Sequence, residues 1–277
     1  MQTISVKSAT IPVVGYGTWQ VKGDTATRMV EAALDCGYRH IDTAQIYQNE
    51  AEVGRGLANA AVDRDAVFLT TKVWMTNYAD NFQASVEESL RKLGTDYVDL
   101  LLLHWPTSDL ELEAYVAPLV RMQELGYTKH IGVSNFLPAQ MRRTAELGAD
   151  CITNQVEYHP LLHQQEVIDT AAALDWCITA YSPLAQGHLR DSEVLREIAN
   201  AHGKSLWQVA LRWLLQHPQM VVLPRTTSEA HLRDNFAVFD FTLSDAEMSR
   251  ISALTKQNRK FADPDFAPDW RYEPLSS

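Results

Sequence analysis

The sequence contains little cysteine and no long hydrophobic run, and both absences limit what the protein can be. Its three cysteines, Cys36, Cys151 and Cys177, are widely spaced and form no C-x-x-C pair. An odd, scattered set of cysteines argues against a disulfide framework or a zinc site and fits a reducing compartment. No stretch approaches the roughly 18 apolar residues of a membrane helix, and residues 1–14 lack the apolar segment of a signal peptide. We therefore expect a cytoplasmic protein that does not enter a membrane.

Basic residues are scarce as well. The 277 residues include 24 Lys and Arg against 35 Asp and Glu, which gives a formal net charge of −11. A surface this negative argues against nucleic acid or an anionic membrane as the main partner. A ligand that carries phosphate would need a local basic site.

Short apolar runs recur along the chain with helical segments between them. A run that is apolar almost throughout, as residues 98–104 are, is typical of a strand covered on both faces. The predicted strands are residues 13–17, 39–42, 67–71, 98–104, 130–134, 152–155, 177–181 and 220–224.

The segments between these strands carry helix start and stop signals. One helix is predicted to end at Gly37, one to run from a cap at Asn81 to Gly94, and one to begin at Ser205 and stop before Pro218. Strand and helix alternate eight times without a linker. The pattern therefore predicts a single-domain (β/α)₈ TIM barrel over residues 1–277, with a doubly wound open sheet as the alternative.

Residues 261–277, FADPDFAPDWRYEPLSS, differ from the rest of the chain. Three prolines make this segment a poor helix, and four aromatic residues make it a poor solvent-exposed tail. We expect it to lie over the barrel, near the mouth.

Chemically useful side chains stand where the predicted strands end. Asp42, Lys72 and His104 each lie at or just after the end of a strand, and Tyr47 follows in the segment IDTAQIYQNE. Barrel active sites form at the C-terminal ends of the strands, so these four side chains should meet at one mouth. Together they suit carbonyl reduction. Tyr47 would donate a proton to the carbonyl oxygen, and a neutral His104 would orient and polarise the carbonyl.

A phenol with a pKa of about 10 needs help to act as an acid at neutral pH. A Lys72 ammonium about 4 Å from Tyr47 would be worth roughly 4 kcal/mol at an effective dielectric near 20. That interaction would lower the pKa of Tyr47 by up to about three units. Asp42 would hold Lys72 in place and keep it charged.

The same residues carry a resemblance to the aldo-keto reductases. The matching blocks run in order from about residue 11 to residue 255, and within the family the chain is most similar to the compact bacterial 2,5-diketogluconate and methylglyoxal reductases. The blocks are GYGTW, DTAQIYQNE, TTKVW, LLLHWP, IGVSNF, NQVEYHP, AYSPL and LPRTTSEAHLRDN.

The resemblance implies a (β/α)₈ barrel that binds NADPH in an extended pose and reduces aldehydes and small ketones, such as methylglyoxal or diketo sugar acids, to alcohols. It places the catalytic tetrad on Asp42, Tyr47, Lys72 and His104. It also implies a set of cofactor contacts that runs from the nicotinamide to the adenosine. These are Thr18, Ser134, Asn135, Gln155, Tyr181, Ser182, Leu184, Pro224, Arg225, Thr226, His231 and Asn235.

The chain departs from the family pattern at two places in the adenosine region. Arg225 stands where the family usually has Lys, and His231 stands where it usually has an Arg that binds the 2′-phosphate. A mostly neutral His weakens that interaction, so some use of NADH is expected beside NADPH.

The segment after HWP is short, which predicts an open substrate pocket. Its expected walls are four tryptophans, namely Trp19, Trp74, Trp105 and Trp270.

Two other classes of function remain open from the sequence. The first is a nicotinamide-binding regulatory or structural protein with little turnover, which the complete tetrad disfavours. The second is a metal-dependent hydrolase. His159 and His163 have an i, i+4 spacing, but Pro160 lies between them and no third ligand is evident, so no metal site is predicted.

Overall fold

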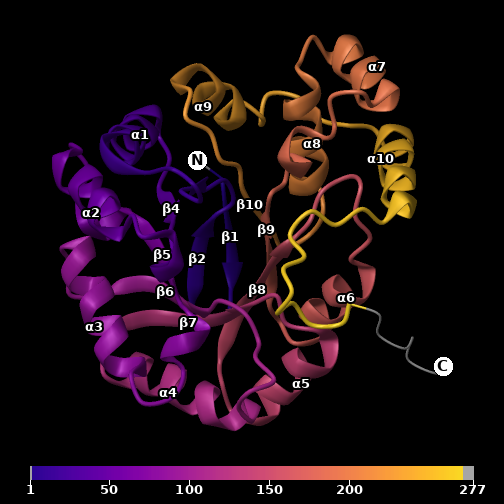
Figure 1. Cartoon of the computed structure of the whole chain (residues 1–277). Helices are drawn as coiled ribbons and strands as arrows, with labels where there is room; N and C mark the ends of the chain where they lie inside the picture. The colour runs from indigo at the N-terminus through magenta and orange to yellow at the C-terminus, as the bar shows by residue number, and fades with distance from the viewer. Residues whose placement is uncertain (1, 271–277) are drawn as a thin grey trace.

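Eight parallel strands form the centre of the molecule, and helices surround them (Figure 1). The structure is a computed structural model that describes residues 2–270. The sheet strands are β3 (Tyr16–Gly17), β4 (His40–Asp42), β5 (Phe68–Val73), β6 (Val98–Leu103), β7 (Thr128–Ser134), β8 (Cys151–Glu157), β9 (Cys177–Tyr181) and β10 (Met220–Leu223).

The sheet closes on itself. Each strand pairs in parallel with the next, from β3 to β10. The segment before β3 then pairs with β10, because Val14 forms a parallel bridge to Val222 and the Val222 N–H donates to the Val13 carbonyl at 2.8 Å. The predicted (β/α)₈ barrel is confirmed, and the alternative of an open doubly wound sheet is wrong.

Ten α-helices are present within residues 2–270. They are α1 (Gly23–Cys36), α2 (Glu50–Asn59), α3 (Phe82–Leu93), α4 (Leu112–Glu124), α5 (Pro138–Glu146), α6 (Gln165–Ala173), α7 (Glu193–His202), α8 (Leu206–Leu215), α9 (Glu229–Phe236) and α10 (Asp245–Ser252). Eight of them complete the βα repeat, while α7 and α10 are additions that pack together beside α8 (Figure 1).

The predicted helix boundaries are confirmed at the glycine stop signals and at the serine cap. Gly37 and Gly94 end α1 and α3 in the left-handed region, at φ of 108° and 67°. Ser205 caps α8 through its side chain, which accepts from the Gln208 N–H while Gln208 reciprocates. Asn81 precedes α3 as predicted, but its side chain forms no cap hydrogen bond.

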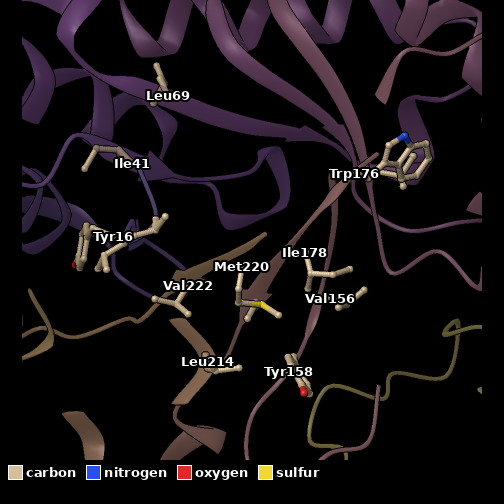
Figure 2. Packing of buried hydrophobic residues seen from close by; sticks show 14 of the residues in the cluster. Tyr16, Ile41, Leu69, Val156, Tyr158, Trp176, Ile178, Leu214, Met220 and Val222 are labelled. Atoms are coloured by element: carbon tan, nitrogen blue, oxygen red, sulfur yellow. The ribbon is translucent and has the colours of Figure 1, made fainter. Parts of the chain in front are cut away.

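The core has two layers because strand residues alternate between the two sides of the barrel wall. On β10, Val221 faces the barrel interior, whereas Met220 and Val222 belong to the layer between sheet and helices. Figure 2 shows part of this outer layer, with Leu214 of α8 near the strand residues.

The sequence prediction missed an N-terminal hairpin. Strands β1 (Thr3–Val6) and β2 (Ala9–Pro12) pair antiparallel, and their residues Val6 and Ile11 belong to the interior cluster that includes Leu100 and Leu102 of β6. The hairpin therefore contributes apolar side chains to the inside of the barrel.

The C-terminal segment crosses the barrel mouth, as predicted for this part of the chain. The N–H groups of Phe261 and Ala262 both donate to the buried Glu157 carboxylate at the end of β8, each at 2.9 Å. Figure 1 shows this segment in yellow, running from α10 towards α6. Residues 271–277 of the predicted tail lie outside the described part of the chain.

Within residues 2–270, no helix has both the length and the apolar character that crossing a bilayer requires.

Candidate active site

Lys72, at the end of β5, is the centre of the residues that the strand ends bring together. Its Nζ lies 2.6 Å from Asp42 Oδ1, 2.8 Å from the Thr43 carbonyl oxygen and 3.4 Å from the Tyr47 hydroxyl. These three acceptors match the three N–H bonds of an ammonium group. The side chain is fully buried, and burial lowers its pKa while the Asp42 carboxylate opposes that shift.

Asp42 is held from two sides. One carboxylate oxygen pairs with Lys72, and the other accepts from Gln155 Nε2 at 2.8 Å. Gln155 comes from β8, across the barrel from β4, so this hydrogen bond joins distant strands over the top of the interior. Asp42 is thereby fixed in a position from which it can orient the Lys72 ammonium.

The pKa of Tyr47 is raised, which is opposite to the sequence-based expectation. Burial is the main cause, and the nearby Asp42 carboxylate adds to it. The prediction that Lys72 lowers this pKa is therefore wrong, because desolvation of the phenolate outweighs the lysine charge. The phenol keeps its proton at neutral pH. Since its oxygen accepts from Lys72, its own O–H is free to point elsewhere.

His104, directly after β6, is neutral as predicted. Burial, with a further contribution from Lys72, holds its pKa well below the ordinary value. Its ring lies edge-on to those of Tyr47 and Trp74, with centroids 5.6 and 5.2 Å away. Its Nδ1 is the one buried side-chain nitrogen or oxygen within residues 2–270 that lacks a hydrogen-bond partner. Such an unpartnered buried atom is unusual in a native structure.

A large cavity opens above these residues. Its volume is about 1400 Å³, and Asp42, Tyr47 and His104 line it while Lys72 lies beneath its floor. A pocket for one drug-sized molecule has roughly 300–1,000 Å³. The cavity therefore has room for a large ligand together with a small one.

The structure brings all but one of the predicted cofactor residues to this cavity. Those that line it are Ser134, Asn135, Gln155, Tyr181, Ser182, Leu184, Pro224, Arg225, Thr226, His231 and Asn235. Thr18 is the exception. It is buried behind the wall, where its hydroxyl donates to the Asp42 carbonyl at 2.9 Å. Its contact with a cofactor stays a prediction.

The residues predicted to hold a nicotinamide amide are already linked to one another. Ser134 donates to the Gln155 carbonyl, Asn135 Nδ2 donates to the His104 carbonyl, and the Tyr181 hydroxyl donates to Asn135 Oδ1. Gln155 lines the cavity, and its Nε2 donates to Asp42. The side-chain oxygen of Gln155 is an atom of this group that can accept from an amide.

The segment after β9 has an unusual backbone. Ser182, Ala185 and Gln186 all have positive φ, between 47° and 49°, in a region that residues with side chains seldom adopt. Each such residue costs on the order of 1–3 kcal/mol, and these conformations cluster at ligand-binding sites. Two of the three, Ser182 and Gln186, line the cavity.

Three of the four predicted tryptophans line the cavity. Trp19 is exposed, Trp74 is partly buried and Trp105 is almost fully buried. Trp270 does not line it but stands behind Trp105, with ring centroids 6.2 Å apart.

Several cavity residues were missed from the sequence, among them Phe266, Arg190 and Trp207. Phe266 packs edge-on against both Trp74 and Trp105, with centroid distances of 5.5 Å. Arg190 follows the strained segment, and Trp207 lies in the first turn of α8. Neither Arg190 nor Trp207 lies in a sequence motif that indicates a binding site. The aromatic tail did signal that it covers the barrel, but not which of its rings enters the cavity.

The His159 and His163 pair has a structural explanation. His159 Nε2 lies 3.0 Å from Glu157 Oε1, and its Nδ1 accepts from the Leu161 N–H. Both ring nitrogens are therefore used, and within residues 2–270 no group of three or more His, Cys, Asp or Glu side chains could hold a metal ion.

Comparison with known proteins agrees with this geometry. The family model described as "Aldo/keto reductase family" matches residues 13–256. The chain is 42% identical over 261 residues to the glyoxal reductase of Bacillus subtilis, covering 92% of this chain and 93% of that protein. It is 39% identical over 266 residues to the methylglyoxal reductase DkgB of Salmonella typhi, covering 94% and 99%.

Solved structures match over almost the whole length. A crystal structure named for 2,5-diketo-D-gluconic acid reductase B superposes with a TM-score of 0.95 at 46% identity, covering 98% of each chain. The aldose reductase of Schistosoma japonicum superposes with a TM-score of 0.91 at 29% identity, covering 99% of this chain and 100% of that one.

Proposed function

This chain belongs to the aldo/keto reductase family, and we propose that it reduces aldehydes and small ketones to alcohols with NADPH, with Tyr47 as the proton donor. The observation that carries the proposal is the hydrogen bonding of Lys72. Its ammonium contacts Asp42 on one side and the Tyr47 hydroxyl on the other, at the floor of a cavity large enough for two ligands.

Tyr47 serves as the acid because of how its oxygen is bonded. The Lys72 N–H donates to that oxygen, so the phenolic proton is directed away from Lys72 and is available to a carbonyl in the cavity. The raised pKa keeps the phenol protonated before reaction. As the proton leaves, negative charge develops on the phenolic oxygen, and the adjacent ammonium stabilises it.

His104 positions the carbonyl. A neutral imidazole can donate one N–H to a carbonyl oxygen without competing with Tyr47 for the proton. Its place beside the Tyr47 and Trp74 rings brings it to the same end of the cavity as the acid. His104 and Tyr47 would thus hold one carbonyl oxygen between them.

The residues of the cavity fit a dinucleotide. When bound, the nicotinamide supplies a hydride to the carbonyl carbon. Gln155 offers its side-chain oxygen to the carboxamide, and the Tyr181 ring faces the same cavity. Among the described residues, Arg190 and Arg225 are the only lysine or arginine residues that line the cavity. The chain as a whole has a net charge of −11. Two isolated cations of this kind suit the phosphates of one bound ligand.

The site supports NADPH with weak discrimination against NADH. Arg225 is fixed by bonds from its Nε and Nη2 to the Trp19 and Gln20 carbonyls, at 3.1 and 3.2 Å. It can therefore present one remaining nitrogen to a 2′-phosphate, while His231 lines the same cavity where the family usually has an arginine. We propose a small-molecule carbonyl as the substrate and the cytoplasm as the location; the oligomeric state is left open.

Initial rates of NADPH and NADH oxidation with methylglyoxal and benzaldehyde test the proposal. We expect turnover with both cofactors and a modestly higher kcat/KM with NADPH. Absence of oxidation with every pair, in a protein that still binds NADPH, would overturn the reductase and favour a binding protein of regulatory or structural kind.

A further inference from the structure

Aromatic side chains form a continuous wall from the reacting phenol to the outer edge of the cavity. The Tyr47 ring contacts His104, His104 contacts Trp74, and Trp74 contacts Phe266, each edge-on with centroids between 5.2 and 5.6 Å apart. Phe266 remains 45% exposed although it is a large apolar ring. Exposed rings that gather at a cavity indicate that an apolar ligand group covers them when bound.

The positive charges of the cavity lie across the barrel from this wall. Trp74 and Trp105 follow β5 and β6, whereas Arg190 and Arg225 lie after β9 and β10. In the ring of eight strands, β9 is four strands away from β5 and β10 is four strands away from β6, which is the largest possible separation, and the other two pairs are three strands apart. Both arginines are therefore remote from the aromatic wall.

Lys72, beside the Tyr47 ring, does not line the cavity, and its ammonium already has three acceptors, whereas the acidic Asp263 does line it near the outer rings. Asp263 lines the cavity, and its Oδ1 accepts from Trp270 Nε1 at 2.9 Å, while Trp270 stands against Trp105. Lys260 approaches from behind and lies 3.6 Å from the centroid of the Trp270 ring, but it does not line the cavity. Lys260 also faces the buried Glu157 carboxylate of β8.

From this arrangement, and resting on the proposed reductase function, we infer that the enzyme selects uncharged aldehydes with an aromatic or compact apolar group and discriminates against aldehydes that carry a carboxylate. An aromatic group can pack against the surface that Trp74, Trp105 and Phe266 present to the cavity. A carboxylate in the same place would lose part of its water shell near Asp263, and the cations that line the cavity among the described residues, Arg190 and Arg225, follow strands on the other side of the barrel.

A pair of substrates with the same skeleton isolates the effect of charge. 4-Carboxybenzaldehyde is anionic at pH 7, and methyl 4-formylbenzoate is its neutral ester. With NADPH at saturation, we expect kcat/KM for the ester to exceed that for the carboxylate by at least about tenfold. Equal values, or a preference for the carboxylate, would overturn the inference while leaving the reductase intact.

Two variants of the tail provide a matched comparison. Asp263→Asn should reduce the ratio of the two kcat/KM values at least about threefold, because it removes the nearest like charge. Asp265→Asn removes a charge from the same exposed segment outside the cavity wall and should leave the ratio unchanged. An unchanged ratio in Asp263→Asn would contradict the role of this carboxylate.

The aromatic contact is tested separately. Phe266→Ala should lower kcat/KM for the ester at least about tenfold more than for methylglyoxal, which is too small to reach that ring. An equal loss for both substrates would show that Phe266 only supports the tail. Absence of cofactor oxidation with any of these aldehydes would overturn the proposed function itself.

Discussion

The two sides of the cavity are built differently. The floor consists of strand-end residues such as Asp42, Lys72 and Gln155, which are buried and hydrogen-bonded to one another across the barrel. The wall towards the outer edge of the cavity consists of loop and tail residues such as Trp74 and Phe266, which pack against each other edge-on, and Phe266 is 45% exposed.

This difference separates two tasks. The floor fixes the relative positions of an acid, its supporting cation and that cation's counter-ion, and a small displacement there would be costly. The wall only needs to offer a surface of suitable shape and charge, so its residues can vary without disturbing the floor. Changes on the floor should therefore affect the rate with every substrate, and changes on the wall should affect the choice among substrates.

The largest effect is expected from removal of the acid. Tyr47→Phe should lower kcat by a factor on the order of 10²–10⁴, the usual contribution of a general acid, with every carbonyl tested. The dissociation constant of NADPH, measured by fluorescence quenching, should stay within about twofold. Turnover close to that of the wild type would show that another group donates the proton.

Breaking the buried ion pair should affect stability as well as rate. Lys72→Met leaves Asp42 charged and unpaired in a dry site, which should lower the free energy of unfolding by about 3–5 kcal/mol in urea titrations. Lys92→Met is the control, because Lys92 pairs with Glu88 on the exposed face of α3 at 3.6 Å. Loss of that exposed pair should leave the free energy of unfolding close to that of the wild type, and equal losses in the two variants would contradict the special role of the buried pair.

The two cavity arginines should differ in cofactor selectivity. Arg225→Ala should raise the dissociation constant of NADPH roughly tenfold and that of NADH little, because a 2′-phosphate contact is lost. Arg190→Ala should weaken both cofactors by a similar factor, as expected for a contact to phosphates that they share.

Isothermal titration calorimetry measures these constants. Arg233→Ala removes an exposed arginine of α9 outside this cavity and serves as the control. If Arg190→Ala weakened the binding of NADPH but not that of NADH, Arg190 rather than Arg225 would be the residue that contacts the 2′-phosphate.

The smallest effect is expected from a change of pH in the neutral range. His104 has a pKa well below its ordinary value of 6.5, so it is already neutral there, and Tyr47 keeps its proton because its pKa lies above 10. Burial lowers the pKa of Lys72, so this lysine loses its proton first as the pH rises. A profile of kcat with methylglyoxal should be flat from about pH 6.5 to 8 and fall on the alkaline side. An inflection at the ordinary pKa of histidine would contradict a neutral His104.

Much of the floor could be predicted from the sequence because strand periodicity fixes where a residue lies. Once the run at 98–104 is taken as a strand of a barrel, His104 must lie at the mouth, and the same reasoning places Asp42 and Lys72. The prediction failed for the pKa of Tyr47, which depends on interaction energies and not only on where the residue lies. Burial outweighed the lysine charge in setting the pKa of Tyr47, and the sequence contains no measure of burial at that atom.

The wall could not be predicted in the same way. Phe266 enters the cavity because the tail is tied to Glu157 by two backbone N–H groups, and that contact joins positions more than 100 residues apart. Arg190 reaches the cavity after a segment of strained backbone, which no residue pattern announced. The N-terminal hairpin was missed because its two strands have four residues each and lie outside the βα repeat.

One measurement tests the division between floor and wall most directly. It compares kcat/KM of the wild type, Tyr47→Phe and Phe266→Ala, each with methylglyoxal and with methyl 4-formylbenzoate. We predict that Tyr47→Phe lowers both values by a similar large factor, whereas Phe266→Ala chiefly changes their ratio. A Tyr47→Phe variant that still reduces either aldehyde at the wild-type rate would contradict the account, because the acid would then lie elsewhere than on the floor.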